Sequence, residues 1–172
     1  CYGHTDVGLD ESFPQEMATI SKKLRSVYFD LVYSSPLTRC STLAQNLQRN
    51  TLRPIGYDDR LKELNFGKWE MKRWDELQLG GLTQWTSHFL EKRVPEGESF
   101  ADQCTRAIAF RDEITQNHEG TVAVVCHAGV MRAILTHILK IPRHTVWNLQ
   151  IPYGQIIKVN KLDNENWLTS FE

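Results

Sequence analysis

The sequence has 172 residues, of which 41% are hydrophobic and 24% are charged, and its formal net charge is -1. This length suits one domain over residues 1–172 that buries a core without disulfides or metal. The balanced charge disfavours a general nucleic-acid binder, which usually carries a basic excess. No apolar run approaches the roughly 18 residues of a membrane span, and no signal pattern opens the chain. From the charge balance we therefore expect no nucleic-acid partner, and from the lack of apolar runs no membrane partner.

Four cysteines, Cys1, Cys40, Cys104 and Cys126, are scattered along the chain without a CxxC pair. Their spacing does not suit a zinc site. We therefore expect four reduced thiols, mostly in the core, and a cytoplasmic protein. Because the chain opens at Cys1 rather than at a methionine, we also expect the natural polypeptide to start further upstream.

The clearest predicted strands are residues 28–34 and 121–127, which are rich in aromatic and β-branched side chains. The second is a nearly continuous apolar run, which is typical of a parallel strand buried on both faces. A third strand is predicted over 155–160. Residues 167–171 could pair with it through a turn at 163–166.

Helical spacing of apolar residues follows most of these strands. Ser35 and Pro36 suit an N-cap and a first-turn proline before the apolar positions of residues 37–47. Ser99 with Asp102 resembles a capping box that opens the next helix. Further helices are expected over 12–26, 71–91 and 129–140. Strands that alternate with helices indicate an α/β fold, a three-layer α/β/α sandwich with a mainly parallel central sheet.

Polar side chains gather where two of the predicted strands run into helices. Arg39 lies in the first turn after the strand over 28–34, and His127 lies at the exit of the strand over 121–127. A guanidinium matches phosphate oxygens, and ligands bind beyond the carboxyl ends of parallel strands. Taken singly, Arg39 suits a surface ion pair and His127 a structural role, whereas their joint placement favours an anion site. Ser34 and Ser35 suit caps better than nucleophiles.

Three glutamates could supply a carboxyl group for proton transfer. Glu63 and Glu70 flank the partly apolar segment 61–70, and Glu98 precedes the capping box. All three are equally compatible with solvated loop positions, so the residues alone do not rank them. Three tryptophans of the same region could line a pocket mouth or fill the core: Trp69, Trp74 and Trp85.

The ordered motifs resemble those of the histidine phosphatase superfamily, which contains cofactor-dependent phosphoglycerate mutases and related phosphatases. Each motif alone is weak, and the signal lies in the four occurring in order with compatible spacing over essentially the whole chain. Within the family, the Tyr2-Gly3 segment and the short length most resemble α-ribazole phosphatases of cobalamin synthesis. The motifs are Ser34-Ser35-Pro36-Leu37-Thr38-Arg39, Leu61-x-Glu63-x-x-Phe66-Gly67-x-Trp69-Glu70, Pro95-x-Gly97-Glu98-Ser99 and Val125-x-His127-Ala128-Gly129-Val130.

The resemblance implies roles for individual residues. Arg39 matches the second phosphate-binding arginine, Glu63 the acid that protonates the leaving alcohol, and His127 the histidine that donates a hydrogen bond to the transferring phosphoryl group. The implied route forms a phosphohistidine and uses neither metal nor other cofactor. Other matched positions border the substrate: Tyr2, Gly3 and the backbone of Ala128. His4 lies beside this segment.

The chain departs from the family pattern in one serious respect, because it has no Arg-His-Gly strand. The resemblance places that strand, with its nucleophilic histidine, about ten residues before Cys1. The resemblance also implies that it lies between the strand that ends at Ser34 and the strand that ends at His127, so that its loss would expose two sheet edges. Smaller departures are Met71, often glycine in the family, and Cys40, often alanine.

The function that these resemblances imply is a phosphomonoesterase, acting on a small phosphate ester such as α-ribazole 5′-phosphate. Two alternatives remain open at this stage. A mutase would return the phosphoryl group to a second hydroxyl, but the short stretch between Gly67 and Pro95 favours hydrolysis. A phosphate-binding protein without catalysis would explain the missing nucleophile. The sequence leaves open whether the protein forms a homodimer.

Overall fold

The computed structural model describes residues 1–48, 51, 53–78, 81–162 and 167–171. Within this part of the chain, no helix combines the length and the apolarity needed to cross a bilayer. The α-helices are α1 (Phe13–Lys23), α2 (Thr38–Leu47), α3 (Trp74–Gln78), α4 (Leu82–Thr86), α5 (Phe100–Asn117) and α6 (Ala128–Ile138). The 3-10 helices are η2 (Asp59–Leu61), η3 (Gly67–Trp69) and η4 (Arg143–Asn148), and the strands are β1 (Leu31–Ser34), β2 (Gly56–Tyr57), β3 (Val122–Val125), β4 (Ile157–Lys161) and β5 (Trp167–Phe171).

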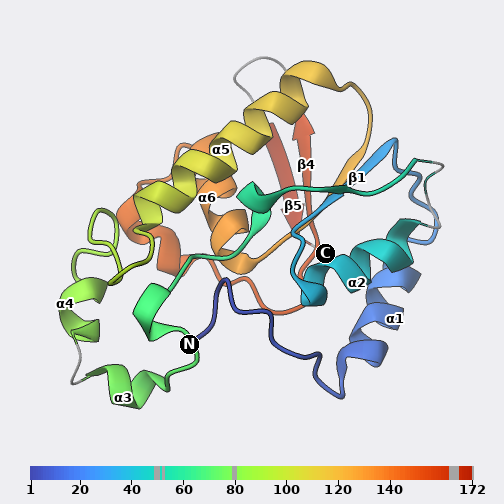
Figure 1. The fold of residues 1–172 in the computed structure, drawn as a ribbon. Helices are drawn as coiled ribbons and strands as arrows, with labels where there is room; N and C mark the ends of the chain where they lie inside the picture. The colour runs from blue at the N-terminus through green and yellow to red at the C-terminus, as the bar shows by residue number, and fades with distance from the viewer. Residues whose placement is uncertain (49–50, 52, 79–80, 163–166, 172) are drawn as a thin grey trace.

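The described strands form two sheets (Figure 1). In the first, β1 lies between β2 and β3 and is parallel to both. In the second, β4 and β5 are antiparallel, as expected for the predicted hairpin. The connecting turn at 163–166 lies outside the described residues. The predicted α/β fold with a parallel central sheet is therefore confirmed.

Helices cover the two faces of the parallel sheet. Because side chains alternate along a strand, neighbouring residues of β1 face opposite layers. Val32 packs in one cluster with Cys40 and Ala44 of α2. Tyr33 joins the cluster on the other face, where its ring meets Phe110 of α5 edge to face at 5.4 Å between centroids. The result is the three-layer arrangement that the alternating pattern predicts.

The expected place of the missing strand is wrong. β1 and β3 pair directly, from Leu31 opposite Val122 to Ser34 opposite Val125. A parallel ladder already joins the two strands, so no strand can lie between them. The outer edge of β3, like that of β2, has no strand partner among the described residues. Val124 on β3 and Val159 on β4 are correspondingly exposed, at 37% and 36%.

Two helix predictions need correction as well. The segment 71–91 forms two short helices, α3 and α4, rather than one. Gly81, at the start of α4, has a φ of 101°, which cannot lie inside a right-handed helix. Ser35 is not the N-cap of α2, which starts at Thr38 after Leu37. The Asp6 carboxylate accepts the Thr38 backbone N–H at 2.8 Å and thus supplies the partner that Ser35 was expected to provide.

The predicted capping box at the start of α5 is confirmed. The Ser99 side chain accepts from the Asp102 backbone, and the Asp102 side chain accepts from the Ser99 backbone. This reciprocal pair fixes the first turn of α5. The first turns of that helix carry Gln103 and Arg106, two polar side chains that face the functional site described below.

Met71, one of the positions that depart from the family pattern, has a φ of 65°. This left-handed conformation costs a residue with a Cβ about 1–2 kcal/mol, a cost that glycine does not bear. The Met71 side chain is largely exposed, so little packing offsets the strain. The glycine that the resemblance implies at this position would avoid this cost.

Met71→Gly is expected to stabilise the protein by about 0.5–1 kcal/mol, because relief of strain exceeds the extra entropy of the unfolded chain. Urea unfolding of the two proteins measures the difference. Met71→Ala is the matched control, since alanine removes the side chain but keeps the strain. Equal effects of the two substitutions would show that backbone strain is not the cause.

Candidate active site

The carboxyl ends of β1 and β3 lie side by side, and each strand leads directly into a helix. Ser34 pairs with Val125 at the last position of the shared register. The chain then enters α2 on one side and α6 on the other. His127 is the N-cap residue of α6, and Arg39 lies in the first turn of α2. The two residues, 88 positions apart in sequence, are thereby brought to one edge of the sheet.

Arg39 and His127 are in direct contact. The Arg39 Nε donates to Nδ1 of His127 at 3.3 Å. Its two terminal nitrogens donate to the backbone carbonyls of Thr5 and Gly3, at 3.1 and 2.7 Å. The guanidinium also lies over the Tyr2 ring, 5.4 Å from the centroid. Residues 2–5 and the two strand exits therefore surround one cationic group.

His127 is buried, with 8% of its surface exposed. Burial is the main cause that lowers its pKa below 6.5, and the nearby Arg39 cation lowers it further. The ring is therefore neutral at neutral pH. Since Nδ1 accepts from Arg39, the proton is assigned to Nε2, which lies 2.9 Å from the Ser35 Oγ. The Cys40 sulfur lies 3.5 Å from the same Nε2 and donates to the Cys126 carbonyl at 3.4 Å.

Glu63 lies on the other side of α6. Its Oε1 accepts from the Leu64 backbone N–H and from Gln103 Nε2, both at 2.8 Å. Its Oε2 accepts from the Gly129 backbone N–H at 3.0 Å. The carboxylate thus sits against the first turn of the helix that His127 caps.

An ion pair holds the loop that carries Glu63. Arg106 of α5 donates to both carboxylate oxygens of Glu98, at 2.8 and 2.9 Å. The same guanidinium donates to the backbone carbonyls of Arg60, Lys62 and Glu63. Glu98 in turn accepts the Asn65 backbone N–H at 2.9 Å. Glu98 is therefore a partner of Arg106 that fixes loop geometry.

Glu70 holds the other side of the site, the segment 3–5. Its carboxylate accepts backbone N–H groups from Gly3, His4, Thr5 and Phe66, at 3.0–3.1 Å. Gly3 has to be glycine, because a Cβ there would lie 1.7 Å from the Leu64 carbonyl oxygen. The carbonyls of this segment are the ones that hold Arg39. Glu70 therefore positions the arginine through the backbone.

Among the three glutamates, the structure separates roles that the sequence left equal. Glu63 borders the α6 N-terminus near His127, Glu70 binds backbone amides, and Glu98 binds Arg106. Ala128 begins α6 directly after His127. Four contributions were not predicted from the sequence: those of Asp6, Ser35, Gln103 and Arg106. The polar Gln103 among core positions of α5 was the available signal for one of them.

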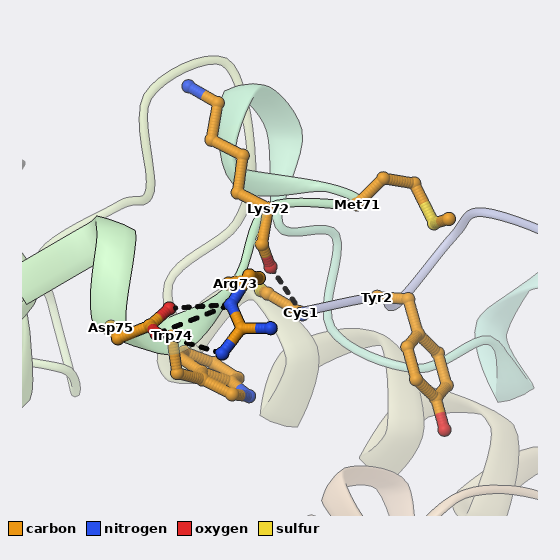
Figure 2. Close-up of a pocket in the computed structure, with 7 residues that line it drawn as sticks. All are labelled: Cys1, Tyr2, Met71, Lys72, Arg73, Trp74 and Asp75. Atoms are coloured by element: carbon orange, nitrogen blue, oxygen red, sulfur yellow. Dashed lines mark hydrogen bonds and ion pairs between the residues drawn. The ribbon is translucent and has the colours of Figure 1, made fainter.

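A cavity of about 470 Å³ opens beside Tyr2, lined by residues 1–2 and 71–75 (Figure 2). Neither Arg39 nor His127 lines this cavity. Tyr2 does, and its ring lies against Arg39, so the cavity is adjacent to the site. Trp74 lines this cavity and is 47% exposed, whereas Trp69 and Trp85 belong to the core. Among the described residues, no three His, Cys, Asp or Glu side chains are grouped so as to hold a metal ion.

Comparison with known proteins identifies the class. A model of the "Histidine phosphatase superfamily (branch 1)" matches residues 1–172, and the chain belongs to this superfamily. Together with relatives that are named phosphatases, this membership assigns the protein to the phosphoric monoester hydrolases. The resemblance drawn from the motifs is therefore confirmed at the level of the family.

Individual relatives are similar over most of the chain. The adenosylcobalamin/alpha-ribazole phosphatase of Escherichia coli K12 is 24% identical over 156 residues, which are 88% of this chain and 77% of the relative. Phosphoserine phosphatase 1 of Hydrogenobacter thermophilus is 25% identical over 154 residues, 85% of this chain and 71% of the relative. The chain spans 66–77% of the length of these and similar curated relatives.

Solved structures show the same fold. The alpha-ribazole phosphatase from Shigella flexneri superposes with a TM-score of 0.89 at 20% identity, over 99% of this chain and 86% of that one. The superposition supports the phosphoglycerate mutase-like architecture that the motifs predict.

Glu70→Gln is expected to change the acid sensitivity of the protein. Hydrogen bonds from Thr5, Gly3, His4 and Phe66 outweigh the effect of burial and lower the pKa of Glu70 from 4.5 to about 2. A carboxyl with a depressed pKa in the folded state stabilises it above pH 4.5, and this contribution is lost as the pH falls towards 2. The difference between wild type and variant should therefore shrink over that window.

The measurement is the urea midpoint of both proteins at intervals from pH 7 to pH 2.5. Glu91→Gln, which removes a carboxylate from an exposed site, is the control. A difference between wild type and Glu70→Gln that stays constant across the window would contradict this role of the Glu70 charge.

Proposed function

We propose that the natural protein hydrolyses a phosphate monoester through a phosphohistidine intermediate. The observation that carries the proposal is the contact between Arg39 and His127 at the exits of β1 and β3, with Glu63 against the same helix terminus. A cationic fork, an imidazole and a carboxylate are the groups that phosphoryl transfer requires for binding, charge stabilisation and proton transfer.

Arg39 would bind the phosphate. A guanidinium has five N–H donors, and three hydrogen bonds to His127, Thr5 and Gly3 leave two for an anion. The bonds to backbone carbonyls fix the plane of the guanidinium before substrate arrives. Positions bordering the substrate would be Tyr2, Gly3 and the backbone of Ala128.

His127 would donate a hydrogen bond to the transferring phosphoryl group. Its neutral ring accepts from Arg39 in the structure described here. A phosphate dianion beside it supplies negative charge, which favours the protonated ring. Nδ1 can then donate to a phosphoryl oxygen in place of accepting from Arg39. Charge on the equatorial oxygens would thus be stabilised from two sides.

Glu63 would transfer a proton in both half-reactions. In the first, a histidine nitrogen attacks phosphorus, the phosphorus–oxygen ester bond breaks, and the leaving alkoxide takes the Glu63 proton. In the second, the carboxylate takes a proton from water as the water oxygen attacks phosphorus and the phosphorus–nitrogen bond breaks. Inorganic phosphate leaves, and the nucleophile and the acid are regenerated.

The nucleophile would come from the polypeptide upstream of Cys1. We propose that an Arg-His-Gly strand there pairs with the outer edge of β3, not between β1 and β3. The exposed Val124 and Val159 support a location between β3 and β4. The carboxyl end of a strand added parallel to β3 would lie beside His127, at the edge of the sheet where the other groups meet.

The substrate that we favour is α-ribazole 5′-phosphate, in cobalamin synthesis. Support comes from the Escherichia coli relative named adenosylcobalamin/alpha-ribazole phosphatase and from the Tyr2-Gly3 segment. We further propose that the enzyme acts in the cytoplasm, in keeping with four cysteines that are all free thiols. A homodimer stays a prediction.

The test is a phosphatase screen of the natural protein, including all residues upstream of Cys1. The panel contains p-nitrophenyl phosphate, α-ribazole 5′-phosphate, phosphoserine and 3-phosphoglycerate. Hydrolysis is expected, and His127→Ala should lower kcat by roughly 10²–10³-fold with little change in stability. His88→Ala, at an exposed histidine, is the control.

Three results of this screen would overturn the proposal in different ways. Absence of turnover together with absence of an upstream histidine would indicate a phosphate-binding protein. Transfer to a second hydroxyl of 3-phosphoglycerate, without release of phosphate, would indicate a mutase. Near-normal turnover of His127→Ala would remove that residue from the mechanism.

Glu63→Gln is expected to slow esters with poor leaving groups more than esters with good ones, because an alkoxide needs the proton and p-nitrophenolate does not. The measurement compares kcat for glycerol 3-phosphate and p-nitrophenyl phosphate in variant and wild type. A loss of the same size for both esters would argue against Glu63 as the acid.

A further inference from the structure

We infer that Gln103 is a positioning residue that decides which oxygen of Glu63 transfers the proton. The inference rests on the proposed function, in which Glu63 is the acid and base. Gln103 lies in the first turns of α5 and is buried, with 1% of its surface exposed. Its Nε2 donates to Glu63 Oε1 at 2.8 Å. A buried amide at a core position carries a desolvation cost that this contact offsets.

The hydrogen bonds distinguish the two carboxylate oxygens. Each oxygen has two lone pairs. On Oε1, both are used, one by the Leu64 backbone N–H and one by Gln103. On Oε2, the Gly129 N–H uses one. A proton can therefore be held on Oε2 without displacing a donor, whereas Oε1 is blocked. Gln103 makes Oε2 the acting oxygen.

The packing around Gly129 leaves little freedom for this arrangement. A Cβ at Gly129 would lie 2.1 Å from Glu63 Oε1 and 2.7 Å from Gln103 Nε2. The carboxylate, the amide and the helix backbone therefore meet in close contact that only glycine allows. From α5, the helix that also carries Gln103, Arg106 donates to the Glu63 backbone carbonyl at 2.9 Å. One helix thus fixes Glu63 at two points, its backbone and its carboxylate.

The test uses Gln103→Met in the natural protein, because methionine keeps the side-chain length and removes the donor. With the donor lost, kcat for glycerol 3-phosphate should fall roughly tenfold, while kcat for p-nitrophenyl phosphate and both KM values change little.

In the Glu63→Gln background, Gln103→Met should cause no further loss, since the residue acts through Glu63. Ile114→Ala, a truncation further along α5, controls for lost stability and should leave the ratio of the two kcat values unchanged.

A spectroscopic readout makes the test independent of turnover. The Gly129 amide proton is hydrogen-bonded to Glu63 Oε2, so its NMR resonance reports the position of the carboxylate. Gln103→Met should shift that resonance in the same direction as Glu63→Ala does. An unchanged Gly129 resonance would overturn the inference, whether or not the protein is active.

Gln103→Glu is the second variant, which keeps side-chain size if methionine disturbs folding. The new carboxylate faces Glu63 and opposes loss of its proton, so the alkaline limb of kcat/KM should move to higher pH. A limb that does not move would contradict the contact. If instead Glu63→Gln has no selective effect on glycerol 3-phosphate, the acid assignment fails, while the Gly129 resonance still decides the role of Gln103.

Discussion

The direct parallel pairing of β1 with β3 is the constraint on which the site depends. The two strands pair over four consecutive residues and end opposite each other, so the segments that follow them start from one edge of the sheet. Arg39 and His127 are far apart in sequence and meet only because of this pairing. A shift by one residue would turn the inward side chains of β3 to the opposite layer and separate the two groups.

The loops around this edge are not held by helices or strands. Charged side chains that bind the loop backbone hold them instead. Glu70 gathers the amides of residues 3–5, and Arg106 gathers carbonyls of residues 60, 62 and 63. A carboxylate suits a cluster of N–H groups and a guanidinium suits a cluster of carbonyls, each with short charge-assisted bonds. The backbone N–H and C=O groups of these loops, which would otherwise need water as a partner, thereby have hydrogen bonds within the protein. The positions of Arg39 and Glu63 are fixed before any ligand binds.

The sequence predicted the fold well where periodicity and caps were clear. The strand of residues 122–125 and the helix that begins after Ser99 follow from apolar runs and a capping box. The expectation that this strand is buried on both faces is wrong, because Val125 is buried whereas Val124 is 37% exposed. The segment 71–91 was predicted wrongly as a single helix. Its apolar residues do pack in the core, but they do so from two short helices, and the left-handed backbone at Gly81 separates these helices. The place of the missing strand, which was taken from the family resemblance, was also mispredicted. The residues themselves could not correct it, since local patterns carry no information about which parallel strands are neighbours. The roles of Glu63, Glu70 and Glu98 could not be ranked, because their partners come from other parts of the chain.

Cys40 shares the His127 environment and bears on which atom can attack phosphorus. Burial is the main cause that raises the pKa of this thiol to about 12, and Arg39 only partly offsets it. Because the thiolate is the reactive form of cysteine, the sulfur beside the imidazole is held in its inert protonated state at neutral pH. In the mechanism proposed above, the Cys40 sulfur would therefore not attack a phosphoryl group bound by Arg39, and formation of a thiophosphate ester there would not compete with transfer to nitrogen.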